Sequence, residues 1–291
     1  MNKLITFFVA VAFIVASCTA GNQNKEVSKI EEKKMENKQT TENKGALVDI
    51  KTSMGDIRIC LYDATPKHRD NFLKLVSEKY YEGTLFHRVI NEFMIQAGDP
   101  DSKNAPAGKM LGSGGPGYNV DAEIVYPQYF HKKGALAAAR QGDQVNPLKK
   151  SSGSQFYIVT GRVYNENQLR QMESQLVNKQ KQGIFNELAM QHRDQIMSMR
   201  KAKDVAGLQA LQDSLIAQVE NVVAKNPASF TPKQKQAYST VGGSPHLDGD
   251  YTVFGEVVSG LDVIEKIEKV ATNAHDRPVE DVKIISMSIV K

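Results

Sequence analysis

Residues 85–98 read Leu-Phe-His-Arg-Val-Ile-Asn-Glu-Phe-Met-Ile-Gln-Ala-Gly. Two runs rich in Val, Ile and Phe flank a polar Asn-Glu corner, which predicts a strand, a tight turn and a second strand. Arg88 and Gln96 interrupt these apolar runs. A cation and an amide beside Phe93 and Met94 make a mostly apolar patch with few polar groups, the usual composition of a small-ligand site. We expect the rest of the chain to be built around this patch.

The sequence on either side predicts a mainly β fold. Residues 47–52 and 57–62 alternate around a Ser-Met-Gly-Asp turn, as in a hairpin. Thr65 and Pro66 predict a helix, with Thr65 as its N-cap and Pro66 in its first turn. The remaining expected elements are extended runs at residues 135–139, 155–160, 252–257 and 282–290 and a short helix at residues 261–270. About eight strands and two helices are typical of a closed antiparallel barrel with capped ends, because closure removes exposed edges.

Three ordered motifs resemble those of the cyclophilins, a family of peptidyl-prolyl cis-trans isomerases. They are residues 85–98, Gly-Ser-Gln-Phe-Tyr at residues 153–157, and Leu-Asp-Gly-Asp-Tyr-Thr-Val-Phe-Gly at residues 247–255. The resemblance divides the barrel into a first part, residues 46–162, and a last part, residues 241–291. It implies the cyclophilin barrel and the isomerisation of X-Pro peptide bonds.

The chemistry of X-Pro bonds explains which residue types such a site needs. Delocalisation of the nitrogen lone pair gives a peptide bond a rotational barrier of roughly 18–20 kcal/mol. When the bond is half twisted, the proline nitrogen becomes pyramidal and accepts a hydrogen bond, which it cannot do in the planar state. A donor aimed there binds only the transition state. Arg suits this role because it keeps its proton and its fork is rigid, and neither a metal nor a cofactor is expected.

The resemblance assigns catalysis to Arg88, as this donor, and to Gln96, which would hold the substrate backbone. Alone, Arg88 would more often be a solvated surface residue, but the ordered motif around it favours the catalytic role. His87 invites a general-base role, yet isomerisation transfers no proton, so we interpret His87 as structural. The resemblance places Phe93, Met94, Tyr157 and Leu247 around the proline ring, and the full set of expected substrate-binding residues is Phe93, Met94, Ala139, Arg140, Gln155, Tyr157, His246, Leu247 and Tyr251.

The chain departs from the commonest eukaryotic cyclophilin pattern at four of these positions. His246 stands where those relatives carry Trp, Tyr251 where they carry His, Tyr157 where they carry Phe, and Arg140 where they carry Asn. Bacterial members tolerate several of these differences. The chain lacks the Trp that contributes to cyclosporin binding, whereas the isomerase core is intact.

The first 45 residues predict export and attachment to a membrane. Residues 1–17 combine a basic start with an apolar run too short to span a bilayer, which is typical of a secretory signal. The Val-Ala-Ser-Cys ending resembles the bacterial lipoprotein signal, in which the cysteine, here Cys18, is lipidated and becomes the new N-terminus. The alternative is an ordinary signal cleaved nearby, which leaves Cys18 a free thiol. Residues 18–45 lack aromatic residues and are rich in polar ones, which predicts a disordered tether.

These features predict a location in the cell envelope. The lipid on Cys18 would anchor the chain to a bacterial membrane, with the folded part in the periplasm or at the surface. The residue after Cys18 is not Asp, which resembles lipoproteins sorted to the outer membrane.

Residues 163–240 form an insertion where relatives have a short loop. Asn165 and Gln168 make a capping box, and Thr231 with Pro232 begins a short third helix. Two apolar stripes predict a helical hairpin subdomain, an accessory that the chemistry does not need. The alternative is a client-binding arm, since methionines suit promiscuous apolar contacts. The first stripe is Leu169, Met172, Leu176, Phe185, Leu188 and Met199, and the second is Leu208, Leu211, Leu215, Val219 and Val222.

Other features argue against several classes of function. The net charge is +4 and the charged residues are dispersed along the sequence, which does not indicate binding to nucleic acid. The six histidines show neither His-x-x-x-His spacing nor Cys partners, so no metal site is indicated. Residues 112–117 match the glycine spacing of a dinucleotide fingerprint, but Pro116 and an extended run follow where a helix is needed. Cys60 lies in an alternating run, which favours a core residue over a redox group.

Two classes of function stay open. The first is an enzyme that isomerises X-Pro bonds in unfolded or nascent envelope and secreted polypeptides. The second is a non-catalytic chaperone or scaffold that binds proline segments and uses the helical insertion. Arg88 beside Phe93, Met94 and Gln96 favours the enzyme, because binding alone does not need the Arg donor.

Overall fold

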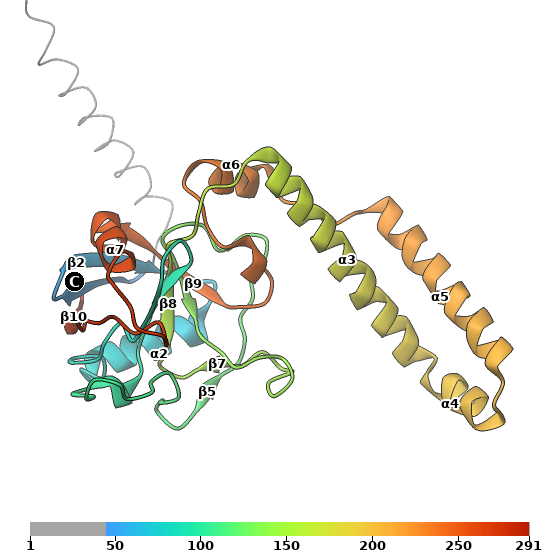
Figure 1. Ribbon diagram of the computed structural model, residues 1–291, viewed down its shortest axis with the longest axis horizontal. Coiled ribbons are helices and arrows are strands. Elements are labelled where there is room, and N and C mark those ends of the chain that lie inside the picture. The colour runs from blue at the N-terminus through green and yellow to red at the C-terminus, as the bar shows by residue number, and fades with distance from the viewer. Residues whose placement is uncertain (1–44, 291) are drawn as a thin grey trace, which may run out of the picture. The chain divides into compact units, whose positions relative to one another are not determined.

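A mainly β architecture is present in the computed structural model, which describes residues 45–290 (Figure 1). Its main strands are β1 (Leu47–Thr52), β2 (Gly55–Leu61), β3 (Arg88–Ile90), β4 (Met94–Ala97), β6 (Ala135–Ala138), β8 (Phe156–Val159), β9 (Val253–Ser259) and β10 (Ile284–Ile289). They form one antiparallel sheet in the order β10-β1-β2-β9-β6-β8-β4-β3. The predictions for the signal peptide and Cys18, and nearly all of the tether, lie outside the described residues.

Alternation of side chains gives the sheet an interior and an exterior face. In β1, Val48 and Ile50 are fully buried, whereas Asp49 between them is partly exposed. In β4, Ile95 and Ala97 belong to the same core cluster as Val48 and Ile50. Met94 belongs to a second cluster, because successive residues of a strand point to opposite faces. The exterior face of β4 is therefore free to build a site.

The chain just before β3 meets the chain just before β10, which brings the two edges of the sheet together. Leu85 and Lys283 form a β-bridge. The Phe86 N–H donates to the carbonyl of Val282 at 2.9 Å. The sheet is thus strongly curled with its edges in contact, and the prediction of an antiparallel barrel of about eight strands is confirmed.

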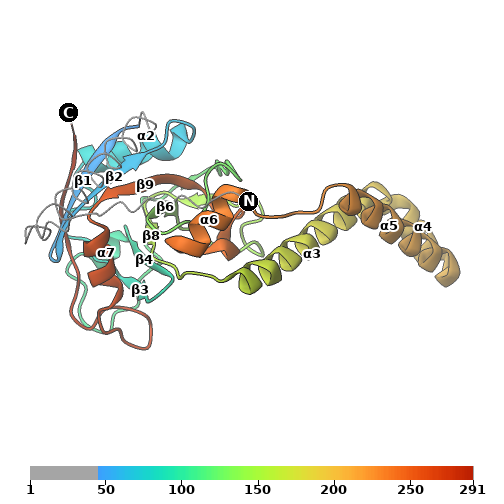
Figure 2. The same ribbon diagram turned by 90° about the horizontal axis from the view of Figure 1, so that it is seen from above.

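Two helices cover opposite sides of the curled sheet, α2 (Pro66–Ser77) and α7 (Leu261–Glu268) (Figures 1 and 2). Phe72 and Leu75 of α2 and Ile264 of α7 are buried in the main core. Both predicted helices are therefore present, and each buries its apolar face against the strands.

The N-terminus of α2 is capped differently from the prediction. The hydroxyl of Thr65 donates to the carbonyl of Tyr62 at 3.3 Å and does not cap the helix. Instead, the Glu123 carboxylate accepts the backbone N–H groups of Lys67 at 3.0 Å and of His68 at 2.9 Å. Thr65 is the N-cap residue and Pro66 lies in the first turn, as predicted, but a carboxylate from a distant loop satisfies the free N–H groups of this turn in place of the Thr65 side chain.

The insertion contains α3 (Glu166–Gln191), α4 (Arg193–Ala202), α5 (Val205–Lys225) and α6 (Pro232–Thr240). α3 and α5 pack on each other as the predicted helical hairpin (Figure 1). Asn165 with Gln168 forms the predicted capping box, and Thr231 with Gln234 forms a second one at the start of α6.

Two details of the predicted stripes are wrong. α3 ends at Gln191 and α4 begins at Arg193, so Met199 does not continue the stripe on α3. Val222, which was predicted to lie in the second stripe, is 49% exposed. The buried residues of α5 are Leu215, Val219 and Val223, because α5 packs along a line of residues four apart.

The glycine-rich residues 112–117 form a loop without a helix, which rules out the dinucleotide fingerprint there. A small second sheet pairs β5 (Asn119–Val120) with β7 (Ser151–Ser152). Cys60 lies buried in β2, and burial raises the pKa of its thiol. None of the described helices combines the length and apolar character that crossing a membrane requires.

Candidate active site

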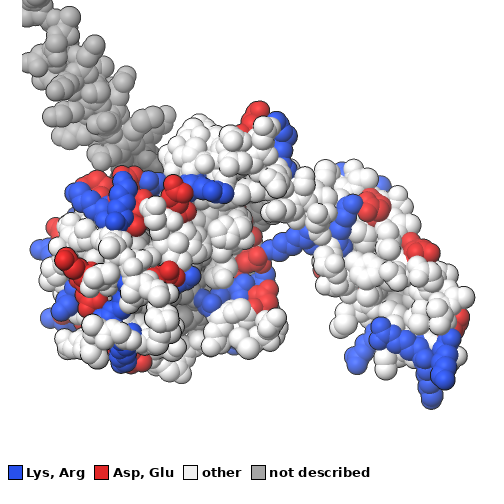
Figure 3. Space-filling model, viewed as in Figure 1, with Lys and Arg blue, Asp and Glu red and all other residues white. Residues whose placement is uncertain are grey.

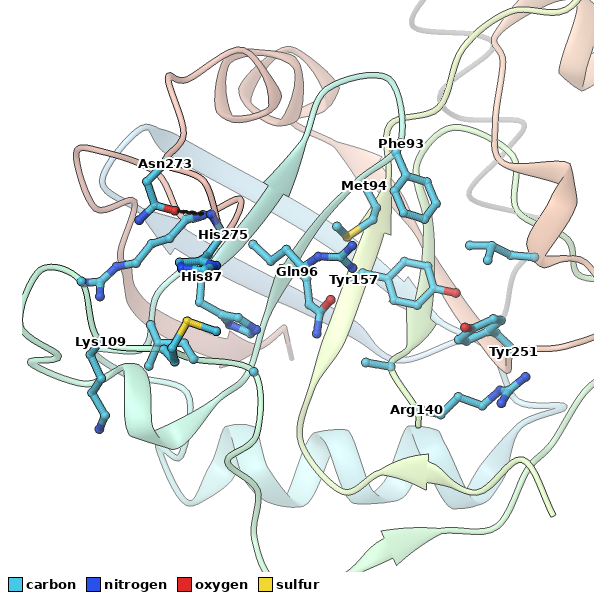
Figure 4. A pocket seen from close by; sticks show the side chains of 18 residues that line it. His87, Phe93, Met94, Gln96, Lys109, Arg140, Tyr157, Tyr251, Asn273 and His275 are labelled. Carbon is cyan, nitrogen blue, oxygen red and sulfur yellow. Dashed lines mark hydrogen bonds between the residues drawn. The ribbon is translucent and has the colours of Figure 1, made fainter. Parts of the chain in front are cut away.

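Three neighbouring strands place Arg88, Gln96 and Tyr157 in one row. Arg88 of β3 lies opposite Gln96 of β4, and Gln96 lies opposite Tyr157 of β8. Residues directly opposite each other point to the same face of a sheet. Met94, two residues before Gln96, also lies on this face, and Figure 4 shows Met94, Gln96 and Tyr157 side by side. The exterior of the sheet thus carries a guanidinium, an amide, a thioether and a phenol next to one another.

These side chains line an open cavity of about 340 Å³, which is within the range of small-ligand sites. Most of the residues predicted from the sequence surround it, although they come from strands, loops and a short helix. The predicted residues that line it are Arg88, Phe93, Met94, Gln96, Ala139, Arg140, Tyr157, Leu247 and Tyr251.

The two other predicted residues, Gln155 and His246, stand next to this cavity. The Gln155 carboxamide accepts a hydrogen bond from Gln96 at 2.9 Å and donates to the carbonyl of Gly114 at 2.7 Å. Gln155 lines a neighbouring cavity of about 500 Å³ beside the glycine-rich loop. The His246 ring centre lies 5.3 Å from that of Phe93, and burial lowers the pKa of His246. Gln155 therefore orients Gln96, and His246 supports Phe93.

Asp276 holds the guanidinium of Arg88 on one side. The Nε of Arg88 donates to Oδ2 of Asp276 at 3.3 Å, and both side chains are 43% exposed. Asp276 is itself fixed, because its carbonyl accepts the N–H of Val89 at 2.8 Å. Within the described residues, the two terminal nitrogens of Arg88 have no hydrogen-bond partner, so they remain available to a ligand.

Aromatic rings and a second arginine form the opposite wall. Tyr157 and Tyr251 pack edge to face with ring centres 6.0 Å apart. The Arg140 guanidinium lies 4.4 Å from the centre of the Tyr251 ring, a cation–π distance, and its Nε donates to the carbonyl of Asp250 at 2.7 Å. Burial raises the pKa of Tyr157 well above its ordinary value, so its phenol stays neutral.

One side of the cavity is formed by residues that were not predicted from the sequence. Lys109, Met110 and Leu111 line it together with Asn273 and His275, and Figure 4 shows Lys109, Asn273 and His275 on the side away from Tyr251. These loop residues belong to none of the three motifs, and no pattern in the sequence relates the two loops.

Arg277, which also lines the cavity, joins these two loops. It is 5% exposed and donates to the carbonyls of Ala105 at 3.0 Å and Pro106 at 2.9 Å. It also pairs with Asp281 at 2.9 Å. The only sequence signal for these contacts is an arginine placed shortly before the last strand.

His87 also borders the cavity, yet it is only 3% exposed. Burial lowers the pKa of His87, so its ring is neutral at pH 7. The described residues contain no group of three or more His, Cys, Asp or Glu side chains that could hold a metal ion. The site combines an apolar pocket with a fixed cation and an oriented amide, which can bind an apolar ring and its peptide backbone.

Comparisons with known proteins identify the family of this chain. The family model described as cyclophilin type peptidyl-prolyl cis-trans isomerase/CLD matches residues 47–179 and 215–289. A putative peptidyl-prolyl cis-trans isomerase of Staphylococcus epidermidis is 28% identical over 254 residues, covering 87% of this chain and 95% of that protein.

Two further proteins are similar. A putative bifunctional phosphatase/peptidyl-prolyl cis-trans isomerase of Streptococcus pyogenes is 29% identical over 252 residues, and this chain spans 39% of its length. The crystal structure of a cyclophilin type isomerase of Cryptosporidium parvum has a TM-score of 0.49 and 20% identity, covering 85% of this chain and 98% of that one. The same Cryptosporidium protein has also been solved in the presence of the dipeptide Ala-Pro. From the match of the family model to both parts of the barrel, the chain belongs to the cyclophilin-type peptidyl-prolyl cis-trans isomerase family.

Proposed function

We propose that this chain accelerates the isomerisation of X-Pro bonds in envelope or secreted proteins by holding the twisted amide against Arg88. The observation that carries the proposal is the row of Arg88, Gln96 and Tyr157 beside an apolar cavity. An apolar pocket accepts the proline ring, and a polar row along one side accepts the peptide backbone.

The ground state is bound by groups that do not distinguish the two isomers. Phe93, Met94 and Leu247 contact the proline ring through apolar surface. The carboxamide nitrogen of Gln96 donates to the side-chain oxygen of Gln155 at 2.9 Å. The carboxamide oxygen of Gln96 therefore remains to accept an N–H of the substrate backbone. These contacts lower KM without lowering the barrier, because they are equal in the planar and twisted states.

Arg88 provides the interaction that appears only in the twisted state. Asp276 fixes the Nε side of the guanidinium, and one terminal nitrogen donates to the pyramidal proline nitrogen. A preorganised donor of this kind contributes about 2.7–4 kcal/mol to the transition state. Since Arg does not lose its proton, this donor is present across the physiological pH range.

We place this activity at a bacterial membrane because of Cys18. We expect Cys18→Ser to abolish attachment, since serine lacks the thiol that would carry the lipid. Fractionation of cells that express each form measures this. If the variant sediments with membranes in the same proportion as the wild type, Cys18 is not the anchor.

The runner-up is a chaperone or scaffold that binds proline segments without turnover. The surface of the insertion favours it, because the large apolar side chains of Met190, Met197 and Val205 are 69%, 58% and 76% exposed. Figure 3 shows basic side chains gathered over α4, where Arg200 and Lys201 are exposed. Such a surface suits contacts with unfolded chains.

A proline-limited refolding assay separates the two functions. The enzyme accelerates the slow refolding phase when it is present at far less than one molecule per substrate molecule, whereas a scaffold acts only at stoichiometric amounts. Acceleration that disappears at low enzyme-to-substrate ratios favours the scaffold.

A further inference from the structure

A chain of buried hydrogen bonds runs from the insertion to the wall of the substrate cavity. The Tyr157 hydroxyl lies 3.0 Å from Nε2 of His131, and Nδ1 of His131 lies 2.9 Å from Oδ1 of Asp248. On its other side, Oδ2 of Asp248 accepts the hydroxyl of Tyr238 at 2.6 Å and the Nε2 of Gln234 at 3.1 Å. Tyr238 and Gln234 belong to α6.

The centre of this hydrogen-bond network is buried and fully paired. The Asp248 side chain is 0% exposed and that of His131 is 1% exposed. Asp248 also accepts the backbone N–H of His131 at 2.9 Å, so its two oxygens together accept four donors. Because a carboxylate only accepts, Nδ1 of His131 must donate, and the Tyr157 hydroxyl is held at Nε2 on the opposite side of the ring. The orientations of the His131 ring and of the Tyr157 side chain are both fixed in this way.

At the end of the hydrogen-bond network that lies in the insertion, the side chains are tightly packed. Tyr238 is 0% exposed, and its ring centre lies 5.5 Å from those of both Phe130 and Phe230. Phe130 precedes His131 in the barrel sequence, so one aromatic cluster contains residues from both the barrel and the insertion. The carbonyl of Tyr238 also accepts the N–H of Tyr164 at 2.9 Å. α6 therefore behaves as part of the barrel rather than as part of the exposed arm.

The other end of the hydrogen-bond network positions side chains that line the substrate cavity. Tyr157 lines the cavity, and so does Leu247, which immediately precedes Asp248. Tyr251 packs edge to face on both His131 and Tyr157, at 6.2 Å and 6.0 Å. In Figure 4 the Tyr157 hydroxyl points away from Gln96, so it serves the link to His131 rather than the reacting bond.

We propose that α6 is a positioning element of the substrate pocket, acting through Asp248 and His131 on Tyr157 and Leu247. The proposal rests on the proposed function, since it concerns how the same pocket is shaped for proline. Tyr238 and Gln234 are positioning residues that never touch the substrate. Loss of their hydrogen bonds to Asp248 frees the pocket wall, which weakens substrate binding before it affects the chemical step.

The test is a double-mutant cycle in the full chain with Tyr238→Phe and Tyr157→Phe. Both changes remove one hydroxyl and keep the ring, so the aromatic packing is preserved. Tyr238→Phe should raise the Kd and KM for a short proline peptide by about two- to thirtyfold, the range for side chains that act on a site through a packed network. The kcat should change little, because the loss falls on ground and transition states alike.

The cycle separates positioning from a purely structural role. In the Tyr157→Phe background, Tyr238→Phe should have a clearly smaller further effect on Kd, because the route through Tyr157 is already cut and only the route through Leu247 remains. Tyr164→Phe is the matched control, since Tyr164 packs in the same cluster and Asp248 takes its four bonds from other residues. It should leave Kd and KM unchanged.

Two results would overturn the proposal. One is a lower Tm for Tyr238→Phe with Kd and KM unchanged in the folded protein, and the other is full additivity of the two substitutions. The peptide titration does not depend on turnover. A wild-type protein without isomerase activity would therefore refute the proposed function while the binding cycle still decides the role of α6.

Discussion

The single residue Arg88 illustrates what could and could not be predicted from the sequence. The motif around it predicted that Arg88, Gln96 and Tyr157 act together, and the strand register places them in one row. Asp276, which orients the guanidinium, was not predicted, because it lies 188 residues away in the chain. Local patterns report neighbours on one element, whereas such a contact depends on how distant loops meet.

Two buried histidines make stability depend on pH. Burial is the main cause that lowers the pKa of both His68 and His87. The unfolded chain therefore takes up protons below about pH 6.5, while the folded chain does so only at lower pH. Stability should fall as the pH drops below about 6.5. Chemical denaturation of the full chain at pH 7.5 and pH 5.5 measures this loss.

Substitution identifies the contribution of His87 to this loss. His87→Leu removes one of the two groups and should reduce the loss of stability between pH 7.5 and 5.5. His275→Gln is the control, because His275 is exposed and should leave the loss unchanged. An unchanged loss in His87→Leu would contradict the assignment.

At the scale of the element, sequence patterns located helices better than they located helix ends and partners. The start of α2 was predicted at Pro66, but its capping group, Glu123, lies 55 residues beyond His68. The stripe that continued to Met199 is broken at His192, since an apolar period alone does not report a change of helix direction. Hairpins and the capping box of Asn165 and Gln168 were predicted correctly because they depend on residues only a few positions apart.

Glu123 should contribute to stability through α2. Glu123→Gln removes the charge that meets the N-terminus of α2 and one of two acceptors, so we expect the free energy of unfolding to fall by about 0.5–2 kcal/mol. Urea denaturation checks this value. Glu187→Gln, an exposed change on α3, should have no such effect. If both variants are equally stable, Glu123 does not cap α2.

At the scale of the whole molecule, the insertion divides into two parts. Residues 163–240 were predicted as one accessory subdomain. The family model leaves only residues 180–214 unmatched between its two segments, and α6 contributes Tyr238 to the buried network at Asp248. The sequence could not separate these parts, because a helix in an arm and a helix on a core show similar apolar periods.

Replacement of the two parts should therefore have different effects. Lys181 of α3 pairs with Glu220 of α5, so a short Gly-Ser loop can replace residues 182–214. This variant should keep kcat and KM on a short proline peptide. Replacing residues 163–240 removes two donors from the buried Asp248, each worth about 1–3 kcal/mol. That variant should be much less stable, and denaturation curves with peptide kinetics compare the two. Equal behaviour of both variants would contradict this division.

The most direct test of the account measures Arg88→Ala by NMR exchange spectroscopy on an X-Pro peptide, beside a peptide titration and a melting curve. The account predicts a loss in kcat/KM of roughly a hundred- to a thousandfold, or about 2.7–4 kcal/mol, with a much smaller change in Kd. Arg88→Lys should also have a low kcat/KM, because a flexible ammonium does not reproduce the planar, forked guanidinium. Arg170→Ala, an exposed change on α3, should match the wild type. Near wild-type turnover in folded Arg88→Ala, or equal losses of binding and turnover, would contradict transition-state stabilisation by Arg88.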